Sequence, residues 1–408
     1  MIASPPLSRP QALFDFAGSG IIDPRLTFTR ASTATRTNKL GYIETVPSGI
    51  PRIDYNPITG AIRGVLIEQQ STNLFLNSST FSSWILLGAS IGDSSEKSPR
   101  DIIAKKITES LVNETHQVYS AVSVVSGSYY SVSIYAKSAE RNHIRISLQS
   151  SAFGDNYAVF NVSTGIVESS YGISAKITQA KNGFFRCSLS AMCISTRSAN
   201  CSFVLLQSAG GPVVYTGNGV SGLLISDAQW EESYSPTSYI PTTTAQVTRA
   251  ADSLSLQSLA FTRAINATEC AIYIDYEINA AAWPASSPVI ACLSNNSGTG
   301  EASGIILSAS QAGLSLDATV SSASQAALSI AAGSQSGAHR VAFSYKTDGF
   351  ALSADNTAPT TDSSGSIPSL TRLDIGSAIG ARHFNGHIKR VAVFPRYADS
   401  TIIQSITQ

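Results

Sequence analysis

Short segments in which apolar and polar residues alternate recur through most of this chain, and they restrict its fold more than any other feature. Tyr130–Lys137 reads YSVSIYAK, and Phe184–Ala191 reads FFRCSLSA directly after Asn182-Gly183, a pair that favours a hairpin turn. Such segments follow one another at roughly ten-residue spacing, which is typical of β-sandwiches and jelly rolls. We find no convincing long amphipathic helix; only Ser400–Ile406 has a helical pattern, with Ser400 as its expected cap. The sequence therefore predicts an all-β protein.

The stretch from Tyr215 to Leu256 divides the chain. It contains an apolar strand over Gly222–Trp230, then a stiff connector with Pro236 and Pro241, and then a second strand-like segment that begins at Gln246. A strand that ends one core, a linker and a strand that begins another are typical of a domain junction. With 408 residues the chain is also too long for one ordinary all-β domain. We predict two sandwiches, over residues 73–245 and 246–408.

The first 72 residues differ from the rest. Residues 1–25 are rich in proline and are expected to form an extended arm that docks on its own body or on a partner chain. Residues 26–72 contain short strand-like segments and turns but few large apolar residues. We predict a small β-rich attachment segment over 1–72 that packs against its neighbours because it cannot build a strong core alone.

Charge and cysteine content exclude several classes of protein. Lys and Arg total 27, as do Asp and Glu, so the net charge is zero and a nucleic-acid binder, which needs a basic face, is not expected. No run of about 18 apolar residues indicates a membrane span, and the first residues do not resemble a secretory signal. Five cysteines without a C-x-x-C pair indicate buried free thiols rather than a disulfide framework or a zinc site.

Several segments resemble one family of proteins. LTFTRASTATR and GYIETVPSGIPRIDYNPITGAIRGVLIEQQSTNLF resemble the N-terminal segment of bacteriophage and prophage tail proteins. YYSVSIYAKSAERNHIRISL, NGFFRCSLSA and GLLISDAQWEESYSPTSYIPT resemble the carbohydrate-binding-module-like jelly roll that follows in that family. HRVAFSYKTDGFALS and LTRLDIGSAIGARHFNGHIKRVAVFPR resemble its C-terminal concanavalin/laminin-G-like sandwich. The order of the motifs matches as well, although Trp230 stands where relatives usually carry an aliphatic residue.

The resemblance implies a tail protein that is made in the host bacterial cytoplasm, is located in the virion and meets the host surface. Our first hypothesis is a tail fibre or receptor-binding protein that binds host cell-surface polysaccharide without cleaving it. It would attach to other virion tail proteins through its N-terminal segment and form a homo-oligomer, with a trimer as the usual fibre state. The alternatives are a purely structural decoration or connector protein and a polysaccharide depolymerase or esterase.

Sugar sites combine aromatic rings, which stack on C–H faces, with planar polar groups that pair with hydroxyls. The loop Ser150–Tyr157 reads SSAFGDNY, and an arginine lies on the strand before it. The alternative is a polar turn whose aromatic residues only anchor the loop. The predicted contacts in and around this loop are Arg145, Phe153, Asp155, Asn156, Tyr157 and Tyr171.

Two tryptophans are further candidates for sugar contact. Trp84 is a ligand platform or, alternatively, a core residue of a first strand. Trp283, in AAWPASSP, is expected in a loop, where it contacts glycan or a partner chain. Trp230 is expected in the core.

Metal and catalytic patterns are weak. His383 and His387 lie four residues apart, but a strand-like segment does not bring that spacing to one face, so no metal site or cofactor is predicted. Calcium remains an alternative if Asp227, Glu231 and Glu232 meet residues 73–77. The sequence contains no G-x-S-x-G elbow, and adjacent glutamates on a strand point to opposite faces, so no enzyme is predicted.

Overall fold

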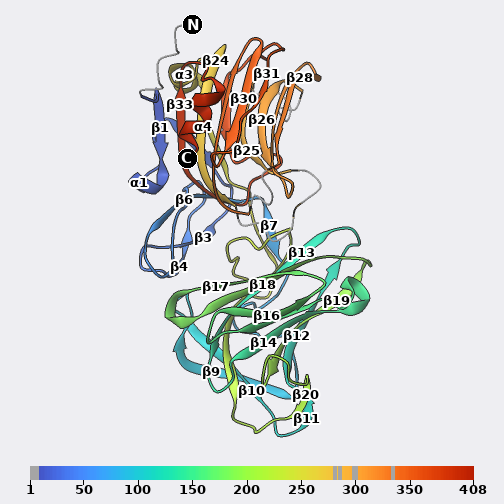
Figure 1. The fold of residues 1–408 in the computed structure, drawn as a ribbon. Helices are drawn as coiled ribbons and strands as arrows, with labels where there is room; N and C mark the ends of the chain where they lie inside the picture. The colour runs from blue at the N-terminus through green and yellow to red at the C-terminus, as the bar shows by residue number, and fades with distance from the viewer. Residues whose placement is uncertain (1–8, 279–282, 284–286, 296–301, 332–335) are drawn as a thin grey trace.

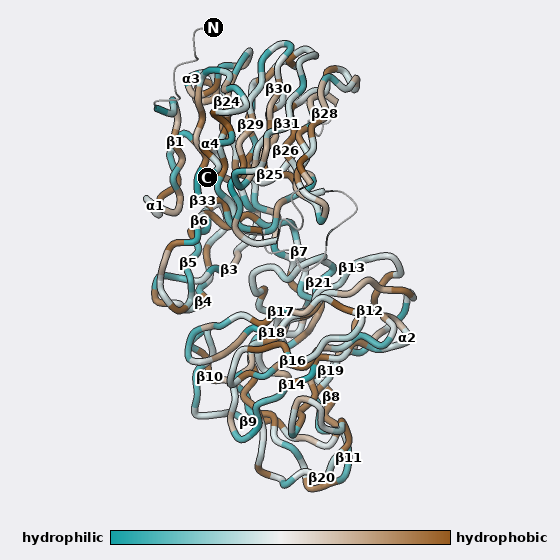
Figure 2. The backbone as a smooth tube through the Cα atoms, viewed as in Figure 1, coloured by the Kyte–Doolittle hydropathy of each residue, from teal (hydrophilic) through white to brown (hydrophobic). Residues whose placement is uncertain are grey.

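The computed structural model describes residues 9–278, 283, 287–295, 302–331 and 336–408. Two β-sandwiches lie one beyond the other along the long direction of the molecule (Figure 1). Hydrophobic and hydrophilic segments alternate along the strands of both (Figure 2). The predicted all-β class is confirmed, and all five cysteines are buried, as expected. The described part of the chain contains no helix long and apolar enough to span a membrane.

The jelly roll consists of two six-stranded sheets with the strand orders β17-β18-β13-β21-β10-β9 and β16-β15-β14-β19-β12-β8. A short pair, β11 (Asn113–Thr115) and β20 (Val214–Thr216), lies at its far end, and helix α2 (Ser150–Phe153) follows β14. Asn182 and Gly183 both have positive φ (60° and 75°) in the turn before β18, as the hairpin signal predicts. The strands are β8 Ile85–Leu87, β9 Ala89–Lys97, β10 Ile103–Glu109, β12 Gln117–Val124, β13 Tyr129–Ser138, β14 His143–Leu148, β15 Tyr157–Asn161, β16 Ile166–Tyr171, β17 Ser174–Gln179, β18 Phe185–Met192, β19 Arg197–Leu206 and β21 Gly222–Glu232.

The C-terminal sandwich contains one sheet in the order β31-β30-β29-β24-β33-β6-β5, with β1 beside β33, and a second in the order β2-β23-β32-β25-β26-β27-β28. Its helices are α1 (Phe16–Ser19), α3 (Ser258–Ala264) and α4 (Ser400–Ile406), and α4 is capped by Asp399 rather than by Ser400. The strands are β1 Ala12–Asp15, β2 Leu26–Thr29, β5 Ile53–Tyr55, β6 Ile62–Ile67, β23 Ser253–Gln257, β24 Glu269–Ile278, β25 Val289–Ser294, β26 Gly304–Ala309, β27 Leu314–Val320, β28 Ala323–Ile330, β29 Gly337–Lys346, β30 Gly349–Ala354, β31 Thr360–Asp362, β32 Arg372–Ile375 and β33 Gly386–Phe394.

The N-terminal segment is part of this sandwich, which differs from the separate attachment unit expected over residues 1–72. Strands β1 and β6 pair with β33, β5 pairs with β6, and β2 pairs with β23. Phe14, Phe16, Val65 and Ile67 are buried in the same core as the C-terminal strands. The segment has too few large apolar residues for its own core, so its strands extend existing sheets. The hairpin of β3 (Ala34–Thr37) and β4 (Ile43–Val46) lies outside both sheets of the sandwich.

The jelly roll is therefore an insertion between β6 and β23 of one sandwich. The chain enters it through β7 (Ser71–Asn73) and leaves it through β22 (Val247–Arg249), and these two strands pair with each other. This paired connection is called the neck below. The predicted junction is seen as β21, a connector and then β22. The chain returns at this point to the C-terminal sandwich, whose first strands precede the jelly roll.

Removal of either part should show this insertion directly. Residues 246–408 alone lack β1, β2, β5 and β6, so we expect them to be insoluble or unfolded by circular dichroism. Residues 9–72 joined to 246–408 by a short Gly/Ser linker should instead give a cooperative unfolding transition, because the two ends of the neck lie side by side. A folded, cooperative 246–408 fragment would contradict the inserted arrangement.

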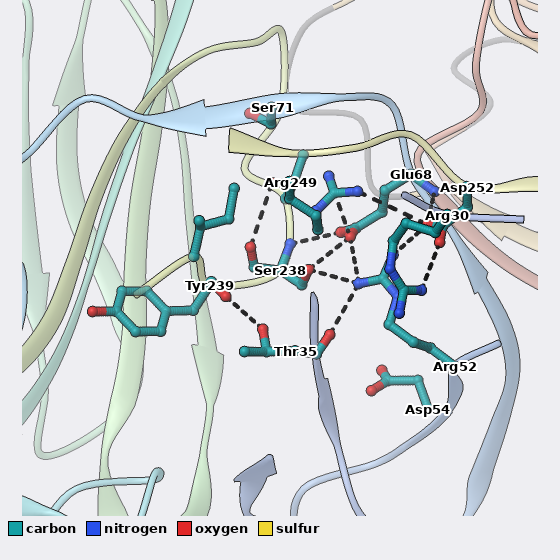
Figure 3. A network of polar contacts seen from close by, with 12 residues as sticks. Arg30, Thr35, Arg52, Asp54, Glu68, Ser71, Ser238, Tyr239, Arg249 and Asp252 are labelled. Atoms are coloured by element: carbon teal, nitrogen blue, oxygen red, sulfur yellow. Dashed lines mark hydrogen bonds and ion pairs between the residues drawn. The ribbon is translucent and has the colours of Figure 1, made fainter. Parts of the chain in front are cut away.

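A buried cluster of charges lies at the neck (Figure 3). The neck cluster consists of Arg30, Arg52, Glu68, Arg249 and Asp252, all almost completely buried. An Arg52 amine lies 2.8 Å from a Glu68 oxygen, and its other amine pairs with Asp252, which lies 3.0 Å from the Arg30 amine. The cluster joins the N-terminal segment to the chain that leaves the jelly roll.

The connector also bonds to this cluster. The backbone N–H and the hydroxyl of Ser238 donate to Glu68 at 2.6 and 2.7 Å. Burial alone would raise the pKa of Glu68, but the charges of Arg249 and Arg52 and the two Ser238 hydrogen bonds lower it to about 2. The neck therefore holds the sandwiches through ionised groups that water does not reach.

Candidate functional site

The sheet that contains β14 and β19 has one face toward the jelly-roll core and one toward solvent. Ile144, Ile146 and Leu148 of β14 lie in the core, so Arg145 and Ser147 point away from it. The same alternation turns Tyr157, Ser202 and Tyr119 outward from β15, β19 and β12. This surface is called the outer face below.

Strand register aligns the outer-face residues in rows that cross the sheet. Ser147 lies opposite Tyr157 on one side and Ser202 on the other, and neighbouring strands continue the row. At about 4.8 Å between strands, a row across six strands is about 24 Å long, enough for a chain of several sugar rings. The first row is Tyr171, Tyr157, Ser147, Ser202, Tyr119 and Ile85, and the second is Ser169, Val159, Arg145, Val204, Gln117 and Leu87. Val159 and Val204 of the second row are buried in a small apolar cluster with Leu206, so the first row is the more open one.

One end of the outer face combines two tyrosines with an arginine. The guanidinium carbon of Arg145 lies 3.8 Å from the centre of the Tyr157 ring, and its Nε donates to Ser147 Oγ at 2.7 Å. The Tyr157 and Tyr171 ring centres are 6.1 Å apart with planes 17° apart. Tyr171 is 61% exposed, so much of its ring and hydroxyl is open to solvent.

This arrangement fixes the arginine. Partial burial lowers the pKa of Arg145, which the nearby Tyr157 partly offsets, and the guanidinium stays charged because the ordinary pKa of an arginine lies far above neutral pH. Its contact with Tyr157 is a cation–π contact, which holds the plane of the guanidinium against the ring. The group that results presents an aromatic surface, a planar donor and hydroxyls to solvent.

The structure brings three of the predicted contacts together, namely Arg145, Tyr157 and Tyr171. The other members of the loop have different positions. Phe153 is 3% exposed and packs in the core, with its ring 6.1 Å from that of Trp230, so the anchoring alternative holds for this residue. Asn156 donates to the Phe153 carbonyl and braces the loop, whereas Asp155 is exposed beside it.

The tryptophans lie away from the outer face. Trp84 is 7% exposed; its ring stacks on Phe203 at 5.8 Å, and its Nε1 donates to the Leu76 carbonyl at 2.8 Å. Trp283 is half-buried against the core of the C-terminal sandwich, in the other domain. Trp230 is buried, as expected. Trp84 is therefore a core residue of the jelly roll rather than a platform.

Sequence reasoning missed Gln117, Tyr119, Ser147 and Ser202. The alternation in QVYSAVSV over Gln117–Val124 places Gln117 and Tyr119 on one face of a strand. Nothing local indicates that this strand pairs with β19 and so joins the row that contains Tyr157.

The carboxylates that the sequence offers as calcium ligands form ion pairs and hydrogen bonds with other protein groups. Asp227 lies 3.0 Å from the Arg100 amine and accepts from Ser79 at 2.9 Å. Buried Glu231 accepts from Ser71, Gln229 and Thr237, and Glu232 accepts from Ser128 at 2.7 Å. Over the described ranges no three His, Cys, Asp or Glu side chains gather as metal ligands would.

No known family model matches this chain, and no curated protein matches its sequence significantly. Solved structures with some similarity include the CBM40 of Ruminococcus gnavus IT-sialidase bound to α2,3 sialyllactose (16% identity, 35% of this chain and 83% of that one, TM-score 0.28). Domains LG4-5 of the mouse laminin α1 chain give 10% identity over 71% of this chain and 92% of that one, with a TM-score of 0.24. Trypanosoma rangeli sialidase gives 11% identity over 80% of this chain and 62% of that one, with a TM-score of 0.29. Scores this low carry no inference about function.

Proposed function

We propose that the outer face of the jelly roll binds a saccharide chain without cleaving it. The observation that carries this proposal is the group formed by Arg145, Tyr157 and Tyr171. The exposed Tyr171 ring offers a flat apolar surface to the C–H face of a sugar, and the tyrosine hydroxyls and the Arg145 guanidinium pair with sugar hydroxyls.

The rest of the row extends this site. Ser147 and Ser202 lie between the tyrosine pair and Tyr119, and Gln117 lies in the next row. Hydroxyl and amide groups spaced along a flat strand surface suit a chain of sugars better than a single ring. The strands that carry Tyr157, Ser147, Ser202 and Tyr119 have a partner on both sides, whereas Tyr171 lies on the edge strand β16, so most of the site is held by paired strands and little conformational entropy is lost on binding.

The finer proposal is that this saccharide belongs to a host cell surface and that the chain is a bacteriophage tail protein. The sequence resemblance, which covers most of the chain from about Leu26, supports it. A single open face binds sugar weakly, so several copies in one oligomeric fibre would raise the avidity. The N-terminal segment over residues 1–72 would then attach the chain to other tail proteins.

Tyr157→Ala should weaken saccharide binding about tenfold, since stacking and packing of one aromatic ring contribute on the order of 1–2 kcal/mol. A glycan array with the whole chain would identify the saccharide, and calorimetry would then give the dissociation constant of each variant. Tyr397→Ala, a half-buried tyrosine of the C-terminal sandwich, is the matched control and should bind like the unchanged chain. Phage particles that carry Tyr157→Ala should also adsorb more slowly to their host.

Equal binding by Tyr157→Ala and the unchanged chain would reject the outer face as the site. Unchanged adsorption by the variant particles would favour the structural connector. Release of reducing ends or acetate from the bound polysaccharide would favour an enzyme.

A further inference from the structure

A cleft of about 750 Å³ lies between the two sandwiches, separate from the outer face. One wall is the surface of the C-terminal sandwich formed by β5, β6, β24 and β33. The other wall is formed by β17 and β18 of the jelly roll, and the β3–β4 hairpin and the connector at residues 235–239 complete it. Figure 3 shows the end of this region beside the neck cluster, where Thr35, Asp54 and Tyr239 lie. The paired neck and the neck cluster hold the walls in place.

The cleft has an excess of positive charge, although the chain as a whole is neutral. Three carboxylates line it, and one of them, Glu68, belongs to the neck cluster. The other two, Asp54 and Glu277, lie on the sandwich wall together with Arg63, whose amine is 2.5 Å from Glu277. The cationic lining residues are Arg36, Arg63, Lys176, Arg186 and Lys389.

Lys176 and Arg186 make the jelly-roll wall positive, and the described residues of β17 and β18 that line the cleft include no carboxylate. Within the described residues neither Lys176 nor Arg186 forms an ion pair; Arg186 donates to Ser133 Oγ at 2.9 Å and to the Thr237 carbonyl at 2.7 Å. Lys176 lies opposite Ser188, and Thr178 lies opposite Arg186, so the two cations are diagonal neighbours on one face. Such neighbours are about 7–8 Å apart, a distance that two long side chains span to reach one carboxylate.

Buried donors without a partner also line the cleft. Asn385 is 2% exposed, and its Nδ2 has no hydrogen-bond partner in the described structure; the Nε of Arg186 has none either. His387 is 1% exposed and bonds to Asp54 through Nε2 at 2.8 Å, and its Nδ1 has no partner. These nitrogens belong to residues that line the cleft, so N–H groups and cations predominate in its lining.

We propose that this cleft is a second binding site and that it takes an acidic oligosaccharide, with the sugar carboxylate held between Lys176 and Arg186. The hydroxyls of Thr178, Ser188 and Thr237 suit a sugar, and the volume suits a few rings rather than a small inorganic ion. The two rows of the outer face, by contrast, contain one cationic side chain, Arg145, which already contacts the Tyr157 ring.

The electrostatics at Lys176 agree with this assignment. Loss of water around its amine lowers the pKa of Lys176, the charge of Arg63 across the cleft lowers it further, and Glu277 opposes both. A ligand carboxylate would remove the repulsion between Lys176 and Arg63. The side chain as a whole remains exposed, so added salt should weaken the attraction.

The test uses the whole chain and calorimetric titration with three acidic probes: trigalacturonate, a hyaluronan tetrasaccharide and an oligomer of sialic acid. We expect at least one to bind saturably, its carboxyl-reduced form to bind at least about tenfold more weakly, and Lys176→Gln to cause a similar loss. Lys176 is exposed on an edge strand, so this variant should fold. Lys106→Gln, on β10 away from the cleft, is the matched control and should change nothing.

Three results would overturn the second site: no saturable binding by any probe, equal binding of the carboxyl-reduced form, or unchanged binding by Lys176→Gln. Tyr157→Ala separates the two proposals, because it should spare the acidic probe and weaken the ligand of the outer face. If Tyr157→Ala loses binding of the acidic probe and Lys176→Gln keeps it, the probe binds at the outer face. The second site would then be rejected, and the proposed function would stand.

Discussion

Arg52→Met should lower the free energy of unfolding by about 3–5 kcal/mol, the usual cost of breaking a buried ion pair from one side. Arg52 is fully buried; it pairs with both Glu68 and Asp252 and also donates to the Thr35 carbonyl at 2.9 Å. Methionine fills a similar space but leaves these acceptors without a donor. Urea unfolding followed by circular dichroism would measure the change.

Arg36→Met is the matched control for this variant. Arg36 pairs with Glu44 at 2.7 Å within the β3–β4 hairpin, and both side chains are partly exposed. An exposed pair contributes about 0–1 kcal/mol, so this variant should unfold almost like the unchanged chain. Similar losses in the two variants would show that the neck cluster has no special role in stability.

The pH dependence of unfolding supplies a second readout of the same cluster. The pKa of Glu68 is lowered from 4.5 to about 2 in the folded chain, so its contribution is present above pH 4.5 and is lost as the pH falls toward 2. At 1.36 kcal/mol per pKa unit this contribution is about 3 kcal/mol. Arg52→Met removes one of the charges that lower this pKa, so the loss of stability between pH 5 and about 2 should become smaller.

Local sequence patterns predicted the strands well. The segments YSVSIYAK and His143–Leu148 lie in β13 and β14, and the Asn182-Gly183 turn precedes β18. These signals are local, because alternation and turn chemistry are set by residues a few positions apart. The inserted arrangement was missed for the opposite reason. The contact between Asp54 and His387 joins residues 333 positions apart, and no short pattern records such a pairing.

The candidate site shows the same division. Arg145, Tyr157 and Tyr171 were found because they lie within 27 residues of one another around one loop and its strands. Tyr119 joins the same face only through β19, and the two walls of the cleft come from strands in different sandwiches. For Trp84 and Phe153 the sequence left a sugar contact and a core or anchoring role both open, and both side chains fill the jelly-roll core because large rings contribute most when they are buried.

Trp84→Ala should lower the free energy of unfolding of the jelly roll by about 3–5 kcal/mol, the range for truncating a buried aromatic side chain. The Trp84 ring packs against Phe75 at 4.4 Å, Phe81 at 5.0 Å and Phe203 at 5.8 Å, so its removal leaves a cavity among three other rings. It also leaves the Leu76 carbonyl without its donor.

The same variant decides between a core role and a ligand role for Trp84. Below its unfolding transition, Trp84→Ala should bind saccharide with the dissociation constant of the unchanged chain, because Trp84 lies on the opposite side of the sheet from Tyr157 and Arg145. Trp84→Phe should recover part of the lost stability and provides the graded control. A variant that keeps its stability but loses saccharide binding would instead make Trp84 a platform, and the outer face would then no longer account for binding on its own.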